Sequence, residues 1–110
     1  DLLDAELPAD EVAEIRRILA DQSHPIATFH KLATRKAGGV RMVDVHILFN
    51  GDETVRNAHD LVSHIERDLR ERFPGMRTMV HIEPCKRDCD SCHVTECPED
   101  TRRETLSDQG

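Results

Sequence analysis

VRMVDVHILFN, residues 40–50, is the stretch that decides the fold, because its apolar and polar side chains alternate. Clear alternation of this kind predicts a β-strand with one buried face, since successive side chains of a strand point to opposite sides. The apolar side chains expected on the buried face are Val43, Val45, Ile47 and Phe49. Gly38 and Gly39 precede this strand as a turn, and a β-compatible segment, residues 26–35, lies before them. These two segments are therefore predicted to pair as an antiparallel hairpin.

Two amphipathic helices flank the hairpin in the sequence. Apolar residues between Val12 and Leu19 recur at helical spacing and predict a helix over residues 9–21. Thr54 can cap a second helix that runs to about Arg72, where Phe73-Pro74-Gly75 ends it.

A third strand is predicted after the second helix, from Met76 to Glu83, and Pro84 is expected to end it. Val80 and Ile82 share the face of this strand that should pack on the helices. The element order is α-β-β-α-β, and its β-α-β part predicts a right-handed crossover with parallel strands. The predicted fold class is therefore α+β, an αββαβ two-layer ferredoxin-like sandwich with an open three-stranded sheet.

Composition limits the classes of function. The 110 residues suit one domain, and a formal net charge of −7 argues against a nucleic-acid partner, which needs a basic face. The same charge is compatible with attracting cations. No apolar run approaches the roughly 20 residues that span a bilayer. Because the chain begins with Asp1 rather than methionine, we expect it to be part of a longer protein, with any membrane part upstream.

Strand alternation also gathers candidate metal ligands. If the apolar side chains of residues 40–50 face the helices, Asp44 and His46 project from the opposite face. The same reasoning puts His81 and Glu83 of the third strand on that face. Imidazoles and carboxylates together suit Zn²⁺, Fe²⁺, Mn²⁺ or similar divalent transition metals. The alternative is a set of solvated polar residues on an open sheet, and such a face is also a natural dimer surface.

Two further histidines are candidates for the same site. His30 lies on the first predicted strand, whose facing the pattern leaves ambiguous. His59 lies at the edge of the apolar stripe of the second helix, from where it could reach the rim of the site. His24 and His64 are expected to be ordinary exposed histidines.

The composition changes from Cys85 onward, where the chain becomes a polar tail expected to be disordered beyond about residue 100. This tail holds a second set of candidate metal ligands: Cys85, Cys89, Cys92, His93 and Cys97. Four thiolates, or three with the imidazole, could close a tetrahedral zinc site. The alternatives are a reduced tail without metal and a redox sensor. The chain is therefore divided into a folded domain, residues 1–84, and a cysteine-rich tail, residues 85–110.

The sequence does not specify an enzyme. Gly38-Gly39 is too short for a phosphate-binding loop, and Asp90-Ser91-Cys92 lacks the pattern of a nucleophile elbow. We therefore predict a protein that is not an enzyme.

Several runs of the sequence resemble the cytoplasmic C-terminal domain of cation diffusion facilitators, a family of dimeric divalent-metal efflux transporters. Residues 29–38, FHKLATRKAG, resemble an H-x-L-x-T-R-x-x-G stretch, and residues 43–47, VDVHI, resemble a hydrophobic-D-x-H-hydrophobic strand of the family. Ala58-His59, Phe73-Pro74-Gly75 and residues 80–84, VHIEP, follow in the family order. The resemblance covers residues 3–84.

The resemblance implies a metallochaperone-like fold and a V-shaped homodimer on the cytoplasmic side of a cell or organelle membrane, below the protein's own six-helix transmembrane domain. By position it implies these sheet and helix ligands: His30, Asp44, His46, His59, His81 and Glu83. Asp44 matches a ligand of magnetosome-type iron transporters in the family, and Glu83 stands where some members carry Asp. The cations that the resemblance implies are Zn²⁺, Cd²⁺, Fe²⁺, Mn²⁺, Co²⁺ and Ni²⁺. Mixed nitrogen and oxygen ligands favour Zn²⁺ by the general affinity order, with Fe²⁺ or Mn²⁺ as alternatives where availability favours them.

Three hypotheses of function follow. The first is a regulatory domain that binds metal across a homodimer and controls efflux by the absent transmembrane domain. The second is a structural dimerisation module whose only metal site is the cysteine-rich tail. The third is a free-standing carrier like a metallochaperone, against which the start at Asp1 argues.

Overall fold

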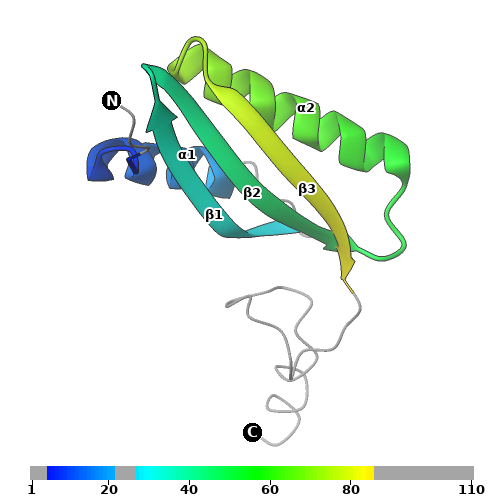
Figure 1. Cartoon of the computed structure of the whole chain (residues 1–110). Coiled ribbons are helices and arrows are strands. Elements are labelled where there is room, and N and C mark those ends of the chain that lie inside the picture. The colour runs from blue at the N-terminus through cyan, green and yellow to red at the C-terminus, as the bar shows by residue number, and fades with distance from the viewer. Residues whose placement is uncertain (1–4, 22–26, 86–110) are drawn as a thin grey trace, which may run out of the picture.

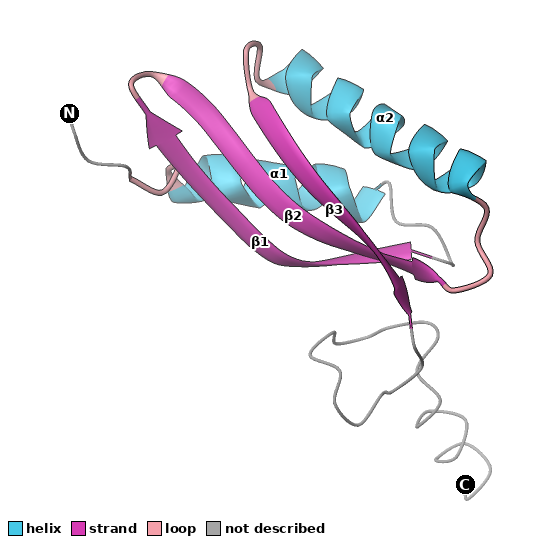
Figure 2. Ribbon diagram, turned by 45° about the vertical axis from the view of Figure 1, so that its right-hand side comes forward, coloured by secondary structure: helices cyan, strands magenta, loops and turns pink. Residues whose placement is uncertain are grey.

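The computed structural model describes residues 5–21 and 27–85 as a two-layer sandwich (Figure 1). The elements in chain order are α1 (Ala9–Asp21), β1 (Ala27–Ala37), β2 (Val40–Asn50), α2 (Val55–Arg72) and β3 (Arg77–Cys85). Both helices lie against one face of the sheet and leave the other face open (Figure 2). The predicted α+β class and the αββαβ order are confirmed. Neither of the two helices in these described ranges is long and apolar enough to cross a membrane.

The sheet has the order β1-β2-β3. β1 pairs with β2 in antiparallel fashion, and β2 pairs with β3 in parallel fashion, as the predicted hairpin and crossover require. The hairpin turns through Gly38 and Gly39, whose φ angles are 58° and 89°. Two consecutive positive φ angles are typical of the tight two-residue hairpin turn, and glycine adopts them without a clash.

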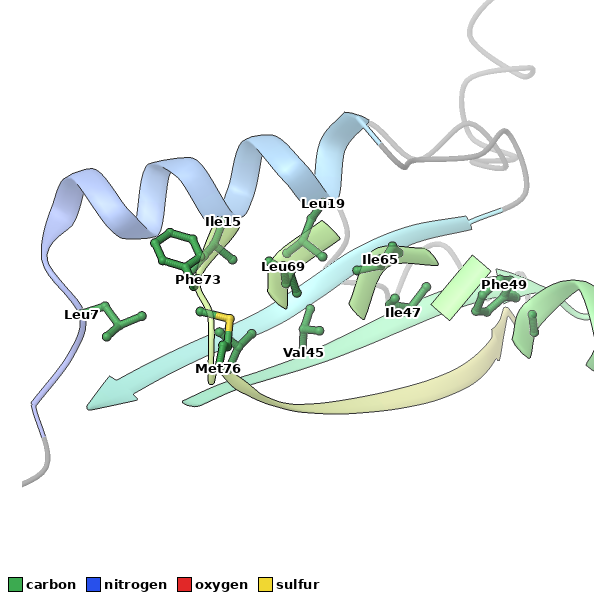
Figure 3. Close-up of a cluster of buried hydrophobic side chains, with 12 residues drawn as sticks. Leu7, Ile15, Leu19, Val45, Ile47, Phe49, Ile65, Leu69, Phe73 and Met76 are labelled. Carbon is green, nitrogen blue, oxygen red and sulfur yellow. The ribbon is translucent and has the colours of Figure 1, made fainter. Parts of the chain in front are cut away.

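Side chains from both layers meet in a core between the sheet and the helices (Figure 3). β2 supplies its alternate apolar residues, all of them buried: Val43, Val45, Ile47 and Phe49. Ile15 and Leu19 of α1 and Leu69 of α2 are also almost fully buried, which fits the predicted apolar stripes. The face predicted from residues 40–50 is therefore the face that holds the layers together.

Local interactions fix where the helices begin and how they sit on the sheet. The hydroxyl of Thr54 accepts a hydrogen bond from the backbone N–H of Asn57 at 3.1 Å, so Thr54 is the N-cap of α2 as predicted. The guanidinium of Arg41 on β2 donates two hydrogen bonds to the carboxylate of Glu11 on α1, at 2.8 and 3.0 Å. This bidentate pair ties the first turn of α1 to the sheet, and it holds the pKa of Glu11 below its ordinary value.

The end of β3 differs from the sequence-based expectation. Pro84 does not end the strand, because β3 continues to Cys85 and Pro84 pairs with Phe49. β3 is an edge strand, where a residue without an N–H is tolerated. Ile82 occupies the helix-facing side with Val80 but is 51% exposed, whereas Val80 packs against the core.

Candidate metal centre

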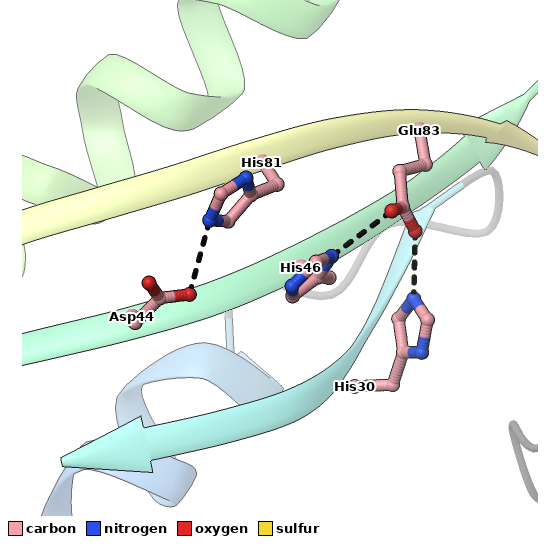
Figure 4. A network of polar contacts seen from close by, with 5 residues as sticks. All are labelled: His30, Asp44, His46, His81 and Glu83. Atoms are coloured by element: carbon pink, nitrogen blue, oxygen red, sulfur yellow. Dashed lines mark hydrogen bonds and ion pairs between the residues drawn. The ribbon is translucent and has the colours of Figure 1, made fainter.

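Three histidines lie side by side across the open face of the sheet. His30 of β1 pairs with His46 of β2, and His46 pairs with His81 of β3, so that one row of the sheet consists of imidazoles. The rings of His46 and His81 are stacked with centroids 4.3 Å apart, and those of His30 and His46 meet edge-on at 5.6 Å. Carboxylates stand on either side of this row (Figure 4).

The first group of candidate ligands consists of His30, His46 and Glu83. Nε2 of His30 donates to Oε1 of Glu83 at 3.1 Å, and Nδ1 of His46 donates to Oε2 of the same carboxylate at 2.9 Å. The side chains of His30 and His46 are only 17% and 22% exposed. Glu83 therefore bridges two half-buried imidazoles that come from different strands.

The second group consists of Asp44, His46 and His81. Nε2 of His81 lies 3.1 Å from Oδ1 of Asp44, and both side chains are more exposed than those of the first group. In each group, one ligand atom per residue lies within 4.8 Å of the others. His46 belongs to both groups, so it joins them.

Glu83 is held in its charged form. The hydrogen bond from His46 keeps the pKa of Glu83 below its ordinary value, burial opposes this effect, and the hydrogen bond from His30 adds to the lowering. If Nε2 of His30 carries the proton that it donates to Glu83, its Nδ1 is a bare acceptor, and this buried atom has no hydrogen-bond partner in the described part of the chain. A negative charge is thus already in place beside two nitrogen donors.

The donor set fits a divalent transition metal. An ion with bonds of about 2.0–2.2 Å needs ligand atoms roughly 3–4 Å apart, so small side-chain rotations would suffice in either group. The protons in the hydrogen bonds from His30 and His46 to Glu83 occupy the space that a cation would take. A bound cation would displace these protons from the two ring nitrogens. Three protein ligands per group leave a coordination position for water or for a ligand from another chain.

The other sequence-predicted ligands lie elsewhere. His59 is on α2, in the layer on the opposite side of the sheet, and its side chain is 77% exposed. Neither described group includes it. Cys85 is the last residue of β3, two positions after Glu83, and is partly buried. The remaining predicted tail ligands, Cys89, Cys92, His93 and Cys97, and the predicted disorder beyond about residue 100 lie outside the described residues.

Sequence reasoning placed four of the candidate ligands on one sheet face but did not predict how they are grouped. The alternation predicted that Asp44, His46, His81 and Glu83 lie on the open face. The row of three histidines depends instead on how the strands are aligned. That alignment has no signal in a single sequence beyond the hairpin turn, which sets only the β1–β2 pairing.

The αββαβ sandwich with joined imidazole–carboxylate groups on its open face defines a small domain of ferredoxin-like fold that carries candidate metal ligands. Comparison with known proteins agrees with this class. Residues 7–85 match the family model described as "Cation efflux protein, cytoplasmic domain", which covers most of the chain. The chain therefore belongs to the family of cation efflux protein cytoplasmic domains.

Individual relatives support the assignment. The chain is 33% identical over 88% of its length to an uncharacterised transporter of Synechocystis and covers 31% of that protein. It is 36% identical over 76% of its length to the cation-efflux pump FieF of Yersinia enterocolitica, of which it covers 27%. The chain thus spans about a third or less of these relatives. The family consists of transporters, in agreement with the predicted lack of enzymatic activity.

A solved structure shows the same fold with metal. The zinc form of CzrB, a candidate zinc transporter, superposes with a TM-score of 0.66 at 37% identity. The alignment covers 74% of this chain and 93% of that one. A metal-bound domain of the transporter CzcD from Thermotoga maritima aligns with a TM-score of 0.60 at 21% identity, over 71% of this chain and 94% of that one, which supports the fold alone.

Proposed function

We propose that this chain is the metal-sensing regulatory domain of a divalent-cation efflux transporter. The observation that carries the proposal is the arrangement around His46, which joins two ligand groups on one open sheet face. A site of two imidazoles and a carboxylate is suited to reversible binding of a divalent ion. The domain would work on the cytoplasmic side of a membrane and act on a transmembrane part of the same protein.

Zn²⁺ is the proposed cation. Nitrogen and carboxylate ligands bind Zn²⁺ more tightly than Fe²⁺ or Mn²⁺ in the general affinity order, although availability in the cell can favour the weaker ions. CzrB, whose zinc form shares this fold, is described as a candidate zinc transporter, which adds support.

The proposed mechanism uses a homodimer. Each group has three protein ligands, so a ligand from a second copy, such as exposed His59, could complete the coordination. Each copy carries a formal charge of −7, and bound cations would offset the repulsion between two acidic copies. Metal would then favour the arrangement of the two domains that binds it more tightly, and this bias would regulate transport.

The alternative function is a dimerisation module whose only metal site is the cysteine-rich tail. The two are separated by titrating Zn²⁺, Fe²⁺ and Mn²⁺ into the full chain and into a variant with Cys85, Cys89, Cys92 and Cys97 changed to Ser and His93 changed to Gln. We expect calorimetric heats of binding to persist in the variant. Loss of all binding in the variant would favour the alternative, and no binding by either protein would reject both sites. Sedimentation with and without metal would report the dimer.

A further inference from the structure

β1 contains an irregularity directly beside His30. His30 pairs with His46 and Ala33 pairs with Asp44, so Lys31 and Leu32 together stand opposite one residue of β2. Two residues against one define a β-bulge. The φ angle of Lys31 is 53°, in the left-handed region where glycine is the usual residue of such a bulge.

The bulge absorbs one residue without changing which face the rest of the strand presents. Phe29 and Leu32 pack against the core and Thr34 is buried, so the helix-facing side continues on both sides of Lys31. His30 and Ala33 pair with open-face residues of β2. If Lys31 were absent, the same alternation would continue through a regular strand. The extra residue is therefore not needed for burying the core, and another effect of the bulge must be considered.

That effect is the direction of β1 at His30. Bulges bend the bulged strand and increase its local twist, and β1 turns near its N-terminal end (Figure 2). His30 reaches Glu83 of β3 at 3.1 Å although β2 lies between these strands. Two strand spacings amount to roughly 9–10 Å between the backbones in a flat sheet, and a bend of β1 toward the carboxylate shortens the distance that the two side chains must span.

We infer that the bulge at Lys31 and Leu32 is the positioning element that brings His30 onto Glu83 and so completes the first ligand group. Lys31 is a positioning residue, because its backbone rather than its exposed side chain sets the direction of the strand. A left-handed residue other than glycine persists where the surrounding structure imposes it, and such positions gather at functional sites. The inference rests on the proposed metal binding, but its geometric part does not require metal.

The second ligand group provides an internal comparison. Asp44, His46 and His81 come from β2 and β3, so the bulge in β1 should not affect them. Zn²⁺ binding at the first group can be isolated in the full chain by two sets of changes. His81→Ala removes the second group, and the tail ligands are replaced with Cys85→Ser, Cys89→Ser, Cys92→Ser, Cys97→Ser and His93→Gln.

Three changes at Lys31 test the inference in this background. Lys31→Gly keeps the bulge and suits its left-handed conformation, Lys31→Val disfavours that conformation, and deletion of Lys31 leaves a regular ladder. We expect Lys31→Gly to bind Zn²⁺ with unchanged affinity. Deletion should weaken binding by about tenfold or more, the scale seen when groups that orient metal ligands are lost, and Lys31→Val should fall between them.

A measurement without metal accompanies the titration. In the unloaded protein, nuclear Overhauser contacts between the ring of His30 and the side chain of Glu83, which are hydrogen-bonded at 3.1 Å, should persist in Lys31→Gly and weaken in the deletion variant. The control is the same deletion of Lys31 in a protein that keeps His81 and carries His30→Ala, so that only the second group can bind. Its Zn²⁺ affinity should not change on deletion.

The outcomes separate the two proposals. Equal affinity and equal contacts between His30 and Glu83 in all three variants would overturn the positioning role. If the deletion variant does not fold, the comparison of Lys31→Val with Lys31→Gly decides, and equal values in these two would also overturn it. If the parent binds no Zn²⁺, the proposed function fails, while loss of the contacts between His30 and Glu83 would still support the role of the bulge.

Discussion

The two faces of β2 carry opposite kinds of chemistry within one strand of eleven residues. The face toward the helices consists of buried apolar side chains from Val43 to Phe49. The open face presents Asp44 and His46, which are partly exposed and lie outside the buried core cluster. If metal binds on the open face as proposed, the alternation of the strand separates stability from binding, so a change at one position should affect one property and spare the other.

Replacing Ile47 with Ala should disrupt packing on the helix-facing side of β2 and have the largest effect on stability. Ile47 is buried in the core, and truncation of such a side chain removes about 2–5 kcal/mol from the free energy of unfolding. Urea unfolding of the metal-free protein measures this loss. Zn²⁺ affinity of the folded protein should remain unchanged, and a parallel loss of affinity would show that the faces are not independent.

Replacing His46 with Ala should weaken metal binding on the open face of β2. This change removes the ligand common to both groups, so Zn²⁺ affinity of the protein with a silenced cysteine tail should fall by more than the 10- to 100-fold that changes in supporting groups typically cause. The metal-free protein should unfold with nearly unchanged stability. His64→Ala, at an exposed histidine of α2, serves as the control, and equal losses in both variants would argue against the sheet-face site.

Replacing Glu11 with Gln should have the smallest effect of the three changes. The effect should be confined to the stability of the fold. Because Arg41 lowers the pKa of Glu11 in the folded protein, the ion pair stabilises the fold above the ordinary pKa of 4.5, and this contribution is lost as the pH falls through the folded value. The variant should therefore lose less stability than the parent on acidification below pH 4.5.

Urea unfolding over a series of pH values measures this difference, with Glu71→Gln as an exposed carboxylate control. Identical pH dependence of the Glu11 variant and the parent would contradict the role of the pair. Zn²⁺ affinity at neutral pH should be the same in both, because Glu11 lies on α1, away from the open face.

Most of the fold could be predicted from the sequence because every second residue from Val43 to Phe49 is apolar and the helices have clear apolar stripes. The same alternation predicted the faces of Asp44, His46, His81 and Glu83. The facing of His30 could not be predicted, because the bulge at Lys31 interrupts the period and no glycine marks it. The continuation of β3 through Pro84 was missed because the edge position of a strand depends on the sheet order rather than on local sequence.

One imidazole common to two ligand groups also has a thermodynamic consequence. The ring of His46 adopts one orientation at a time, so an ion bound in the first group fixes the ring that the second group needs. Occupancy of one group would therefore change the affinity of the other, and this coupling would be equal in both directions. The proposed sensor would then respond over a range of concentrations set by the coupling energy as well as by the intrinsic affinity of either site.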